Sequence, residues 1–242
     1  VAITWTVGHL LATRLFGRDA RVGVLAGVSS AFANNVFFGL PLVERTVGSD
    51  GIVAVSILLA VHLPLMMVIG TLLMERAEHR VNGGAARGLW NVLRQVGANL
   101  LHNPLVIGLV AGVLMHLSGL ALPGVLASVV DQITAMAAPA ALISLGMALN
   151  KYGVHGNVGI ATVIAALKLL LMPACVWSAC HLLGLSPDWT AALVLTSCVP
   201  TGINAWLIAN RFGVGHGLAA SAISLSTAVG VLSVTFWAWL LQ

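Results

Sequence analysis

Residues 198–210 read CVPTGINAWLIAN and lie in a largely apolar part of the chain. They place Pro200, Gly202 and Asn204 where the surrounding composition favours a membrane-spanning helix. Proline removes one backbone hydrogen bond and crowds the carbonyl four residues earlier, and glycine tolerates unusual dihedral angles. In lipid the freed N–H and C=O groups need partners, so a broken helix persists only inside protein or beside a water-filled cavity. The stretch therefore predicts a helix that is interrupted within the membrane.

The composition of the whole chain supports a membrane protein. Of 242 residues, 59% are hydrophobic and 7% are charged, whereas a soluble domain carries about 25% charged residues. A membrane-spanning helix needs about 20 mostly apolar residues. We therefore expect an all-α polytopic membrane protein with eight spans, at 1–16, 22–43, 52–74, 104–122, 125–149, 158–183, 190–209 and 217–241. Cys175, Cys180 and Cys198 all lie in apolar runs without metal-binding spacing, so we expect no disulfide, metal or cofactor.

The basic residues indicate how the spans are oriented. Lys and Arg number 11 against 7 acidic residues, and most lie in connections between spans, which indicates topology and not a nucleic-acid partner. Arg45 stands alone on one side of the membrane. Nine residues fall on the other side, which we expect to be cytoplasmic: Arg14, Arg18, Arg21, Arg76, Arg80, Arg87, Arg94, Lys151 and Arg211.

The connection at 75–103 is the longest in the chain and is predicted to be cytoplasmic. Leu89, Trp90, Leu93, Val96 and Leu100 recur with helical spacing on one face. This pattern predicts an amphipathic helix at the membrane surface. A solvated linker is the alternative.

A weak internal repeat appears when the chain is shifted by 166 residues against itself. The shift aligns VERTVGSDGIVAVS with ANRFGVGHGLAASA, and pairs Arg45 with Arg211. The two copies share one layout but point in opposite directions by the charge count, as inverted repeats of secondary transporters do. We therefore expect residues 1–74 to belong to a first repeat and residues 104–242 to form a second.

The same shift places the opening stretch opposite SSAFANNVFFGLPLV, residues 29–43. We expect two crossovers, near 33–41 and near 199–204. Two helices broken near the membrane midplane would present unpaired backbone N–H groups and partial positive charge, which suit a carboxylate. The amides of Asn34, Asn35 and Asn204 would add hydrogen-bond donors without the cost of burying a full charge.

The segments ANNVFFGLPLV and VPTGINAWLIANRFGV resemble the two crossover motifs of the auxin efflux carrier (AEC) family, whose bacterial members include carriers for malonate and related acids. NPLVIGLVAGVL at 103–114 and MAAPAALISLGMAL at 136–149 extend the resemblance. The family is similar in fold to bile-acid sodium symporters, with ten helices in two inverted repeats. On that pattern, the eight spans are helices three to ten, with two more preceding Val1. The resemblance implies a secondary transporter that moves a small organic anion across the bacterial inner membrane by alternating access.

The resemblance also implies site residues. Asn34, Pro200 and Gly202 match the crossover motifs, and Thr201 occupies a small polar position. Gly39 and Pro41 match a structural Gly-x-Pro, whereas Ala33 and Asn35 depart from the Pro-Asn-Thr or Gly-Asn-Thr that often precedes it. The expected substrate-binding set is Asn34, Asn35, Lys168, Pro200, Thr201, Gly202 and Asn204.

Lys168, His62 and His181 fall inside predicted spans. A cation near the bilayer centre costs about 2.5–3.5 kcal/mol on insertion scales, so it usually faces a cavity or pairs with an acid. Lys168 is either a countercharge for an anion or a lysine in a polar interface without a transport role. For the two histidines, an inert hydrogen bond between helices is the favoured interpretation over titration during transport.

Coupling, partners and function class remain open at this point. Export of an anion from a negative interior needs no coupled ion, whereas uptake needs protons or sodium. The alternatives are therefore a sodium- or proton-coupled symporter of another organic acid, a channel, or an intramembrane enzyme. Ser29, Ser30, Ser144, Ser197 and Ser224 show no nucleophile motif with a spaced base, so we do not expect an enzyme. Membrane lipid and a second copy of the chain are the other expected partners.

Overall fold

The computed structural model describes residues 1–83, 90, 94, 97–98, 101, 104–152 and 157–242. In these ranges all regular elements are helices. β-type backbone pairing occurs there only as one isolated bridge. Three π-helical turns, η1 to η3, interrupt or continue the α-helices. In chain order the elements are α1 (Ala2–Leu10), η1 (Leu11–Leu15), α2 (Ala20–Ala31), η2 (Asn35–Gly39), α3 (Leu40–Thr46), α4 (Ser49–Asn82), α6 (Pro104–Ser118), α7 (Gly124–Tyr152), α8 (Val158–Ala166), η3 (Leu167–Leu171), α9 (Met172–Leu182), α10 (Pro187–Ser197), α11 (Asn204–Phe212) and α12 (His216–Leu240).

Long apolar helices confirm the predicted all-α membrane fold. Within the described residues, three helices are long and apolar enough to cross a membrane: Ser49–Val81, Val158–Leu182 and His216–Leu240. The second joins α8, η3 and α9 without a break. α4 continues to Asn82, beyond the Met74 at which the predicted span ended.

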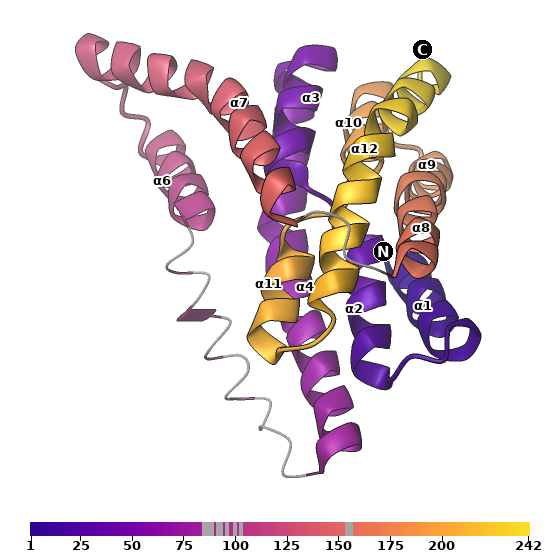
Figure 1. Ribbon diagram of the computed structural model, residues 1–242. Helices are drawn as coiled ribbons and strands as arrows, with labels where there is room; N and C mark the ends of the chain where they lie inside the picture. The colour runs from indigo at the N-terminus through magenta and orange to yellow at the C-terminus, as the bar shows by residue number, and fades with distance from the viewer. Residues whose placement is uncertain (84–89, 91–93, 95–96, 99–100, 102–103, 153–156) are drawn as a thin grey trace.

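Two of the predicted spans are interrupted, as the sequence indicated. The span at 22–43 consists of α2, an extended segment at residues 32–34, and then η2 with α3. The span at 190–209 consists of α10, a non-helical segment at residues 198–203, and then α11. In Figure 1 each pair of half-helices meets near the middle of the bundle, where the connecting segments cross.

A proline follows two of the three π-helical turns. Pro41 and Pro173 each follow a π-helical turn, η2 and η3, by two positions. Because Pro173 has no N–H, the Leu169 carbonyl four residues earlier cannot form its usual α-helical bond. Instead, Leu169 accepts hydrogen bonds from Ser233 Oγ at 2.8 Å and Trp237 Nε1 at 3.1 Å. A polar group freed by proline thus attaches the η3 turn to α12.

The internal repeat has a register of 167 positions. Gly17 and Gly184 both have positive φ before a broken span, and Gly48 and Gly215 both have positive φ before a long helix. α4 and α12, the helices that follow, run in opposite directions (Figure 1). The sequence match at 166 was one residue short, because it aligned Arg45 with Arg211 and so placed Gly48 opposite Val214 and not opposite Gly215. The division into a first repeat at 1–74 and a second at 104–242 stays a prediction.

Polar contacts join several predicted cytoplasmic connections at one end of the bundle. Arg18 Nη2 donates to Asn157 Oδ1 at 2.7 Å, which links the start of α2 to the start of α8. Arg21 lies 3.5 Å from Glu78, near the end of α4. The predicted amphipathic helix at 75–103 lies largely outside the described residues, as does Arg87.

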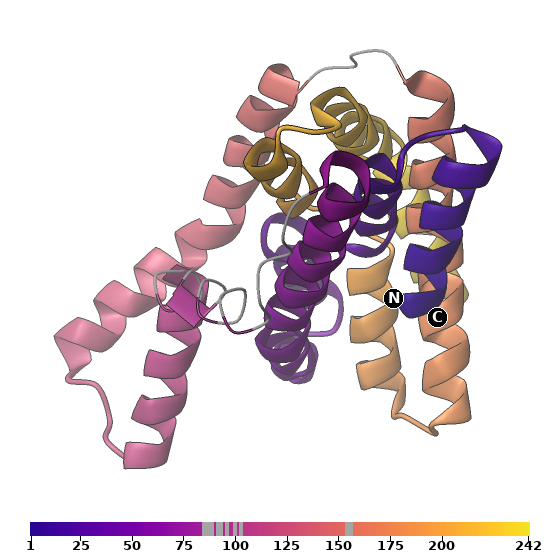
Figure 2. The same ribbon diagram turned by 90° about the horizontal axis from the view of Figure 1, so that it is seen from below.

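α6 and α7 form a hairpin that projects from the other helices (Figures 1 and 2). α7 contacts the bundle at η2 and α12, and α6 contacts α4. Ile107, Val110, Val113, Leu114 and Ile133 are exposed on this hairpin. Exposed apolar side chains of this kind are compatible with contact with lipid.

Candidate substrate site at the helix crossover

The two interruptions pair with each other through their backbones. Ala33 and Thr201 form an antiparallel bridge. The Asn34 N–H donates to the Pro200 carbonyl at 2.9 Å, and the Gly202 N–H donates to the Phe32 carbonyl at 2.8 Å. Backbone groups released by one broken helix are therefore satisfied by the other, which is how non-helical backbone persists at membrane depth.

Side chains complete the hydrogen bonding of the crossover. Thr201 Oγ1 donates to the Ser29 carbonyl at 2.8 Å, and the Thr201 N–H donates to Ser226 Oγ at 3.1 Å. Thr201, Ser29 and Ser226 are fully buried. The hydrogen bonds of Thr201 therefore connect the second interruption to α2 and α12.

Two glycines allow the close approach of these segments. A Cβ on Gly202 would lie 2.9 Å from the Ala33 carbonyl oxygen, a backbone atom that cannot rotate away. A Cβ on Gly230 of α12 would lie 2.8 Å from Pro200 Cγ. Gly202 is thus required by the contact between the two interruptions, and Gly230 makes room for the Pro200 ring.

The crossover brings together half-helix ends of both polarities. η2 and α11 start at Asn35 and Asn204, and α2 and α10 end at Ala31 and Ser197. Helix starts present unpaired N–H groups and partial positive charge, whereas helix ends present carbonyls and partial negative charge. Lys168 Nζ donates to the Ser197 carbonyl and thereby caps the end of α10.

Lys168 is 0% exposed, and this carbonyl is its hydrogen-bond partner. Within the described part of the chain, no carboxylate lies within ion-pair distance of its ammonium group. A half-helix end carries only about half an elementary charge. The ammonium charge is therefore only partly compensated.

A cavity of about 70 Å³ lies against the crossover. One water needs roughly 10–15 Å³ of such volume, so the cavity has room for about five waters or a small carboxylate. Asn35, His62, Thr196 and Ser197 provide its polar lining. The remaining lining residues are Val1, Ala33, Leu58, Met172, Val176 and Leu193.

The amides at the first crossover are buried with unused hydrogen-bonding capacity. Asn35 is 4% exposed, and its Oδ1 has no partner among the described residues. The Nδ2 of Asn34 is likewise buried without a partner there. Because buried polar groups are nearly always hydrogen-bonded, an orphaned amide that lines a cavity suggests a missing ligand.

The structure separates the predicted binding residues into three groups. Asn35 lines the cavity, whereas Asn34, Pro200, Thr201 and Gly202 form the crossing backbone behind it. Asn204 is half-buried at the start of α11 and is not among the lining residues. Lys168 reaches the carbonyl of Ser197, which itself lines the cavity. The binding roles of all these residues stay predictions.

Gly39 and Pro41 support the first half of the site. A Cβ on Gly39 would lie 3.1 Å from Asn35 Oδ1 and 3.3 Å from Thr196 Cγ2. Gly39 therefore leaves space for the Asn35 amide beside α10. Pro41 is in the first turn of α3, where its missing N–H costs little.

Sequence reasoning did not include three of the polar lining residues, His62, Thr196 and Ser197, in the binding set. Thr196 and Ser197 precede the interruption and make helix-internal hydrogen bonds, so nothing in their spacing marks them. His62 carried a signal, because an ionisable residue at membrane depth is a functional candidate by default. In the described ranges, no group of three or more His, Cys, Asp or Glu side chains could hold a metal.

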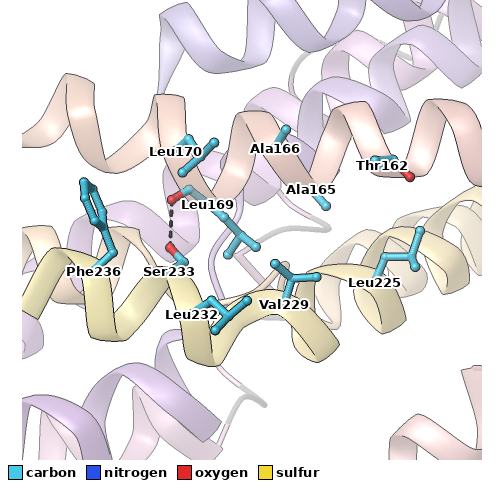
Figure 3. A pocket seen from close by; sticks show the side chains of 10 residues that line it. All are labelled: Thr162, Ala165, Ala166, Leu169, Leu170, Leu225, Val229, Leu232, Ser233 and Phe236. Atoms are coloured by element: carbon cyan, nitrogen blue, oxygen red, sulfur yellow. Dashed lines mark hydrogen bonds between the residues drawn. The ribbon is translucent and has the colours of Figure 1, made fainter.

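A second, larger hollow differs in character from the crossover cavity. It has a volume of about 400 Å³ and lies between the α8–η3 segment and α12 (Figure 3). Its lining is almost wholly apolar, and its two hydroxyls, on Thr162 and Ser233, donate to the carbonyls of Val158 and Leu169. No polar group in this hollow calls for a ligand.

Two interrupted helices that cross beside a cavity are an arrangement found in membrane transport proteins. A family model described as "Membrane transport protein" matches residues 1–238, so the chain belongs to that family, the AEC family that its crossover motifs indicated. It is 25% identical over 246 residues to a protein of Rhizobium meliloti (strain 1021) named "Putative malonate transporter", covering 100% of this chain and 75% of the relative. It is also 25% identical over 235 residues to an "Uncharacterized transporter" of Methanothermobacter thermautotrophicus, covering 97% and 73%.

Proposed function

We propose that this membrane transport protein is a secondary carrier for a small organic carboxylate, with malonate as the first candidate. One observation carries the proposal: Lys168 is a buried, incompletely compensated cation that donates to the carbonyl of Ser197, a residue that lines the crossover cavity. Transport would proceed by alternating access around the crossed half-helices, in a bacterial inner membrane with the arginine-rich ends in the cytoplasm.

Electrostatics favour an anion over a neutral guest. Burying an ammonium group without a counterion is costly, and an anion nearby lowers that cost. The start of η2 at Asn35, which lines the cavity, adds partial positive charge, and Lys168 offsets the partial negative charge at the end of α10. A carboxylate in the cavity would accept hydrogen bonds from Asn35 Nδ2 and the first N–H groups of η2, while Lys168 acts through Ser197. The unpartnered Asn35 Oδ1 can only accept, so it would not bind a carboxylate oxygen.

The size of the cavity favours a short substrate. About 70 Å³ is adequate for a few heavy atoms, which suits a short carboxylate. The name of the Rhizobium relative includes malonate, a three-carbon dicarboxylate. We therefore propose short mono- and dicarboxylates as the substrate class.

The membrane potential sets the direction of uncoupled transport. Moving one negative charge outward across 100 mV, inside negative, releases about 2.3 kcal/mol. Export of a carboxylate therefore proceeds without a coupled ion, whereas accumulation requires one.

Counterflow in proteoliposomes tests the proposal. Purified protein is reconstituted with unlabelled malonate inside, and entry of labelled malonate is followed. We expect transient accumulation of label, the same effect with other short carboxylates inside, and none with neutral malonamide. Absence of counterflow with malonate, succinate and lactate alike would refute a carboxylate carrier. Fluxes without trans-stimulation would indicate a channel.

A further inference from the structure

His62 occupies a position that the proposed binding set does not use. It lies on α4, is 7% exposed, and lines the crossover cavity together with Asn35. Its ring packs edge-on against Phe32 of the first interruption, with centroids 5.4 Å apart and planes at 84°. The imidazole therefore contacts both the cavity and the segment that must rearrange when the crossover moves.

The surroundings of His62 are positively charged. Lys168 on η3 acts on it electrostatically. The Cys198 thiol at the end of α10 interacts with Lys168. The neighbouring cavity residues on α9 and α10, Met172, Val176, Leu193 and Thr196, carry no charge. In the described part of the chain, no carboxylate acts on His62, so the anion expected in the cavity is the natural counter-ion for a second cation.

We propose that His62 is the proton-binding residue through which this carrier couples entry of an organic anion to entry of a proton. This inference rests on the proposed carboxylate carrier and adds the coupling ion and its binding residue. It chooses a proton over sodium because the cavity offers an imidazole and an amide and no carboxylate cage.

The proposed step involves only an N–H bond. A proton from the outer solution binds a ring nitrogen of neutral His62, and the same bond breaks when the proton leaves on the cytoplasmic side. In the empty cavity, an imidazolium would face Lys168 without a counter-ion. A bound carboxylate supplies that counter-ion, so the anion and the proton strengthen each other's binding by the same factor. Accumulation of the anion therefore depends on the bound proton, whereas exchange of bound for free anion does not.

The coupling predicts a definite degree of accumulation. With one proton per substrate and the membrane potential clamped to zero, a pH gradient of one unit supports about tenfold accumulation, because a tenfold proton ratio balances a tenfold substrate ratio. Exchange of labelled for unlabelled substrate moves no net proton. A carrier that lacks only the coupling residue should therefore exchange but not accumulate.

The experiment uses the full chain in proteoliposomes with labelled malonate and three proteins: wild type, His62→Gln and His181→Gln. Glutamine retains hydrogen-bonding capacity but does not titrate. His181 is a matched control, because it is exposed on α9 and its Nδ1 bonds to the Trp177 carbonyl of its own helix. Each protein is assayed for counterflow at equal pH and for accumulation driven by an alkaline interior, with protein-free liposomes to correct for diffusion of the undissociated acid.

We expect wild type and His181→Gln to accumulate malonate about tenfold per pH unit. His62→Gln should still exchange label at saturating malonate, with a higher half-saturation concentration that no longer depends on pH, and should equilibrate label without accumulation. Accumulation by His62→Gln at the wild-type level would overturn the inference, as would wild-type accumulation driven by sodium and insensitive to pH. Loss of counterflow in His62→Gln alone would make His62 a substrate ligand and also contradict the coupling role. Absence of counterflow in wild type would instead refute the proposed function itself.

Discussion

The two interruptions solve one structural problem with different residues. The first, residues 32–34, is short and contains neither proline nor glycine. The second, residues 198–203, is longer and contains Pro200 and Gly202. The second helix is broken by its own proline and glycine. The first helix is broken by contact with the second interruption, whose Gly202 and Pro200 exchange backbone hydrogen bonds with Phe32 and Asn34. A helix can thus be interrupted by a sequence more than 160 positions away.

The same asymmetry appears in how the preceding half-helices end. Near the end of α2, the Ser29 carbonyl accepts a neutral hydroxyl from Thr201. At the end of α10, the Ser197 carbonyl accepts the ammonium group of Lys168. The second crossover therefore carries the charge and the obligatory glycine, while the first supplies the amide that lines the cavity. Substitutions can test this division of roles.

The largest effect is expected from Gly202→Ala. The added methyl would lie 2.9 Å from the Ala33 carbonyl oxygen, so the two interruptions must separate. Overpacking of this kind costs about 1–3 kcal/mol, and we expect counterflow to fall at least about tenfold, the factor for about 1.4 kcal/mol. Thermal unfolding in detergent and counterflow measure the two effects.

Gly159→Ala on α8 is the control, because its added methyl would meet only Phe16 Cε1 at 3.7 Å, an ordinary contact. Wild-type unfolding and transport in Gly202→Ala would show that the interruptions do not pack as closely as the structure indicates.

Lys168→Met is expected to weaken carboxylate binding without destabilising the fold. Loss of the buried charge should raise the concentration for half-maximal counterflow on the order of tenfold, equivalent to about 1.4 kcal/mol. The substitution removes a charge that is costly to bury but leaves the Ser197 carbonyl without its donor, so the two effects on stability should largely offset each other. The concentration for half-maximal counterflow should therefore rise while the unfolding temperature stays nearly unchanged.

Arg45→Met, in the last turn of α3, controls for charge alone. A lower unfolding temperature with unchanged half-saturation in Lys168→Met would make Lys168 a helix cap with no influence on the substrate.

A comparison of the adjacent amides sharpens the assignment within the first crossover. Asn35 lines the cavity and Asn34 does not. Asn35→Ala removes a ligand worth about 0.5–1.5 kcal/mol, so half-saturation should rise roughly two- to tenfold. Asn34→Ala should change it less. The reverse order, measured by counterflow, would move the substrate from this cavity to the other face of the crossing segments.

The predictable part of this molecule follows from its periodicity and composition. The long apolar runs predicted the all-α membrane fold, of which three long spanning helices are found among the described residues, and Pro200 with Gly202 predicted the second break. The first break was predicted only through the internal repeat and the family resemblance, because Phe32 and Ala33 have no local tendency to leave a helix. His62 could not be assigned to the cavity, since its place there depends on contacts among α4, α9 and α10 that sequence spacing does not report.

The smallest effect concerns the starts of the two broken spans, Asp19 before α2 and Ser186 before α10. Asp19 Oδ1 accepts the Val22 N–H at 2.9 Å, whereas the Ser186 side chain forms no cap bond. Asp19→Ala should therefore cost about 1 kcal/mol, or about 2–4 °C in unfolding temperature, with transport unchanged. Ser186→Ala should leave the unfolding temperature nearly unchanged. Equal decreases in unfolding temperature in both variants would contradict the difference in capping.

The stabilisation by Asp19 should also depend on pH in a definite direction. Burial alone would raise the pKa of its carboxyl, but hydrogen bonds from the Val22 N–H and the Arg21 guanidinium outweigh burial and hold this pKa below its ordinary value of 3.8. A carboxyl whose pKa is lower in the folded state stabilises the fold above the unfolded-state pKa and loses that contribution as the pH falls through the folded one. The difference in unfolding temperature between wild type and Asp19→Ala should be constant from pH 8 to about pH 5 and shrink below about pH 4. A difference that grows on acidification would mean that the carboxyl is protonated more readily in the folded chain, and that the cap at α2 does not bind a charged Asp19.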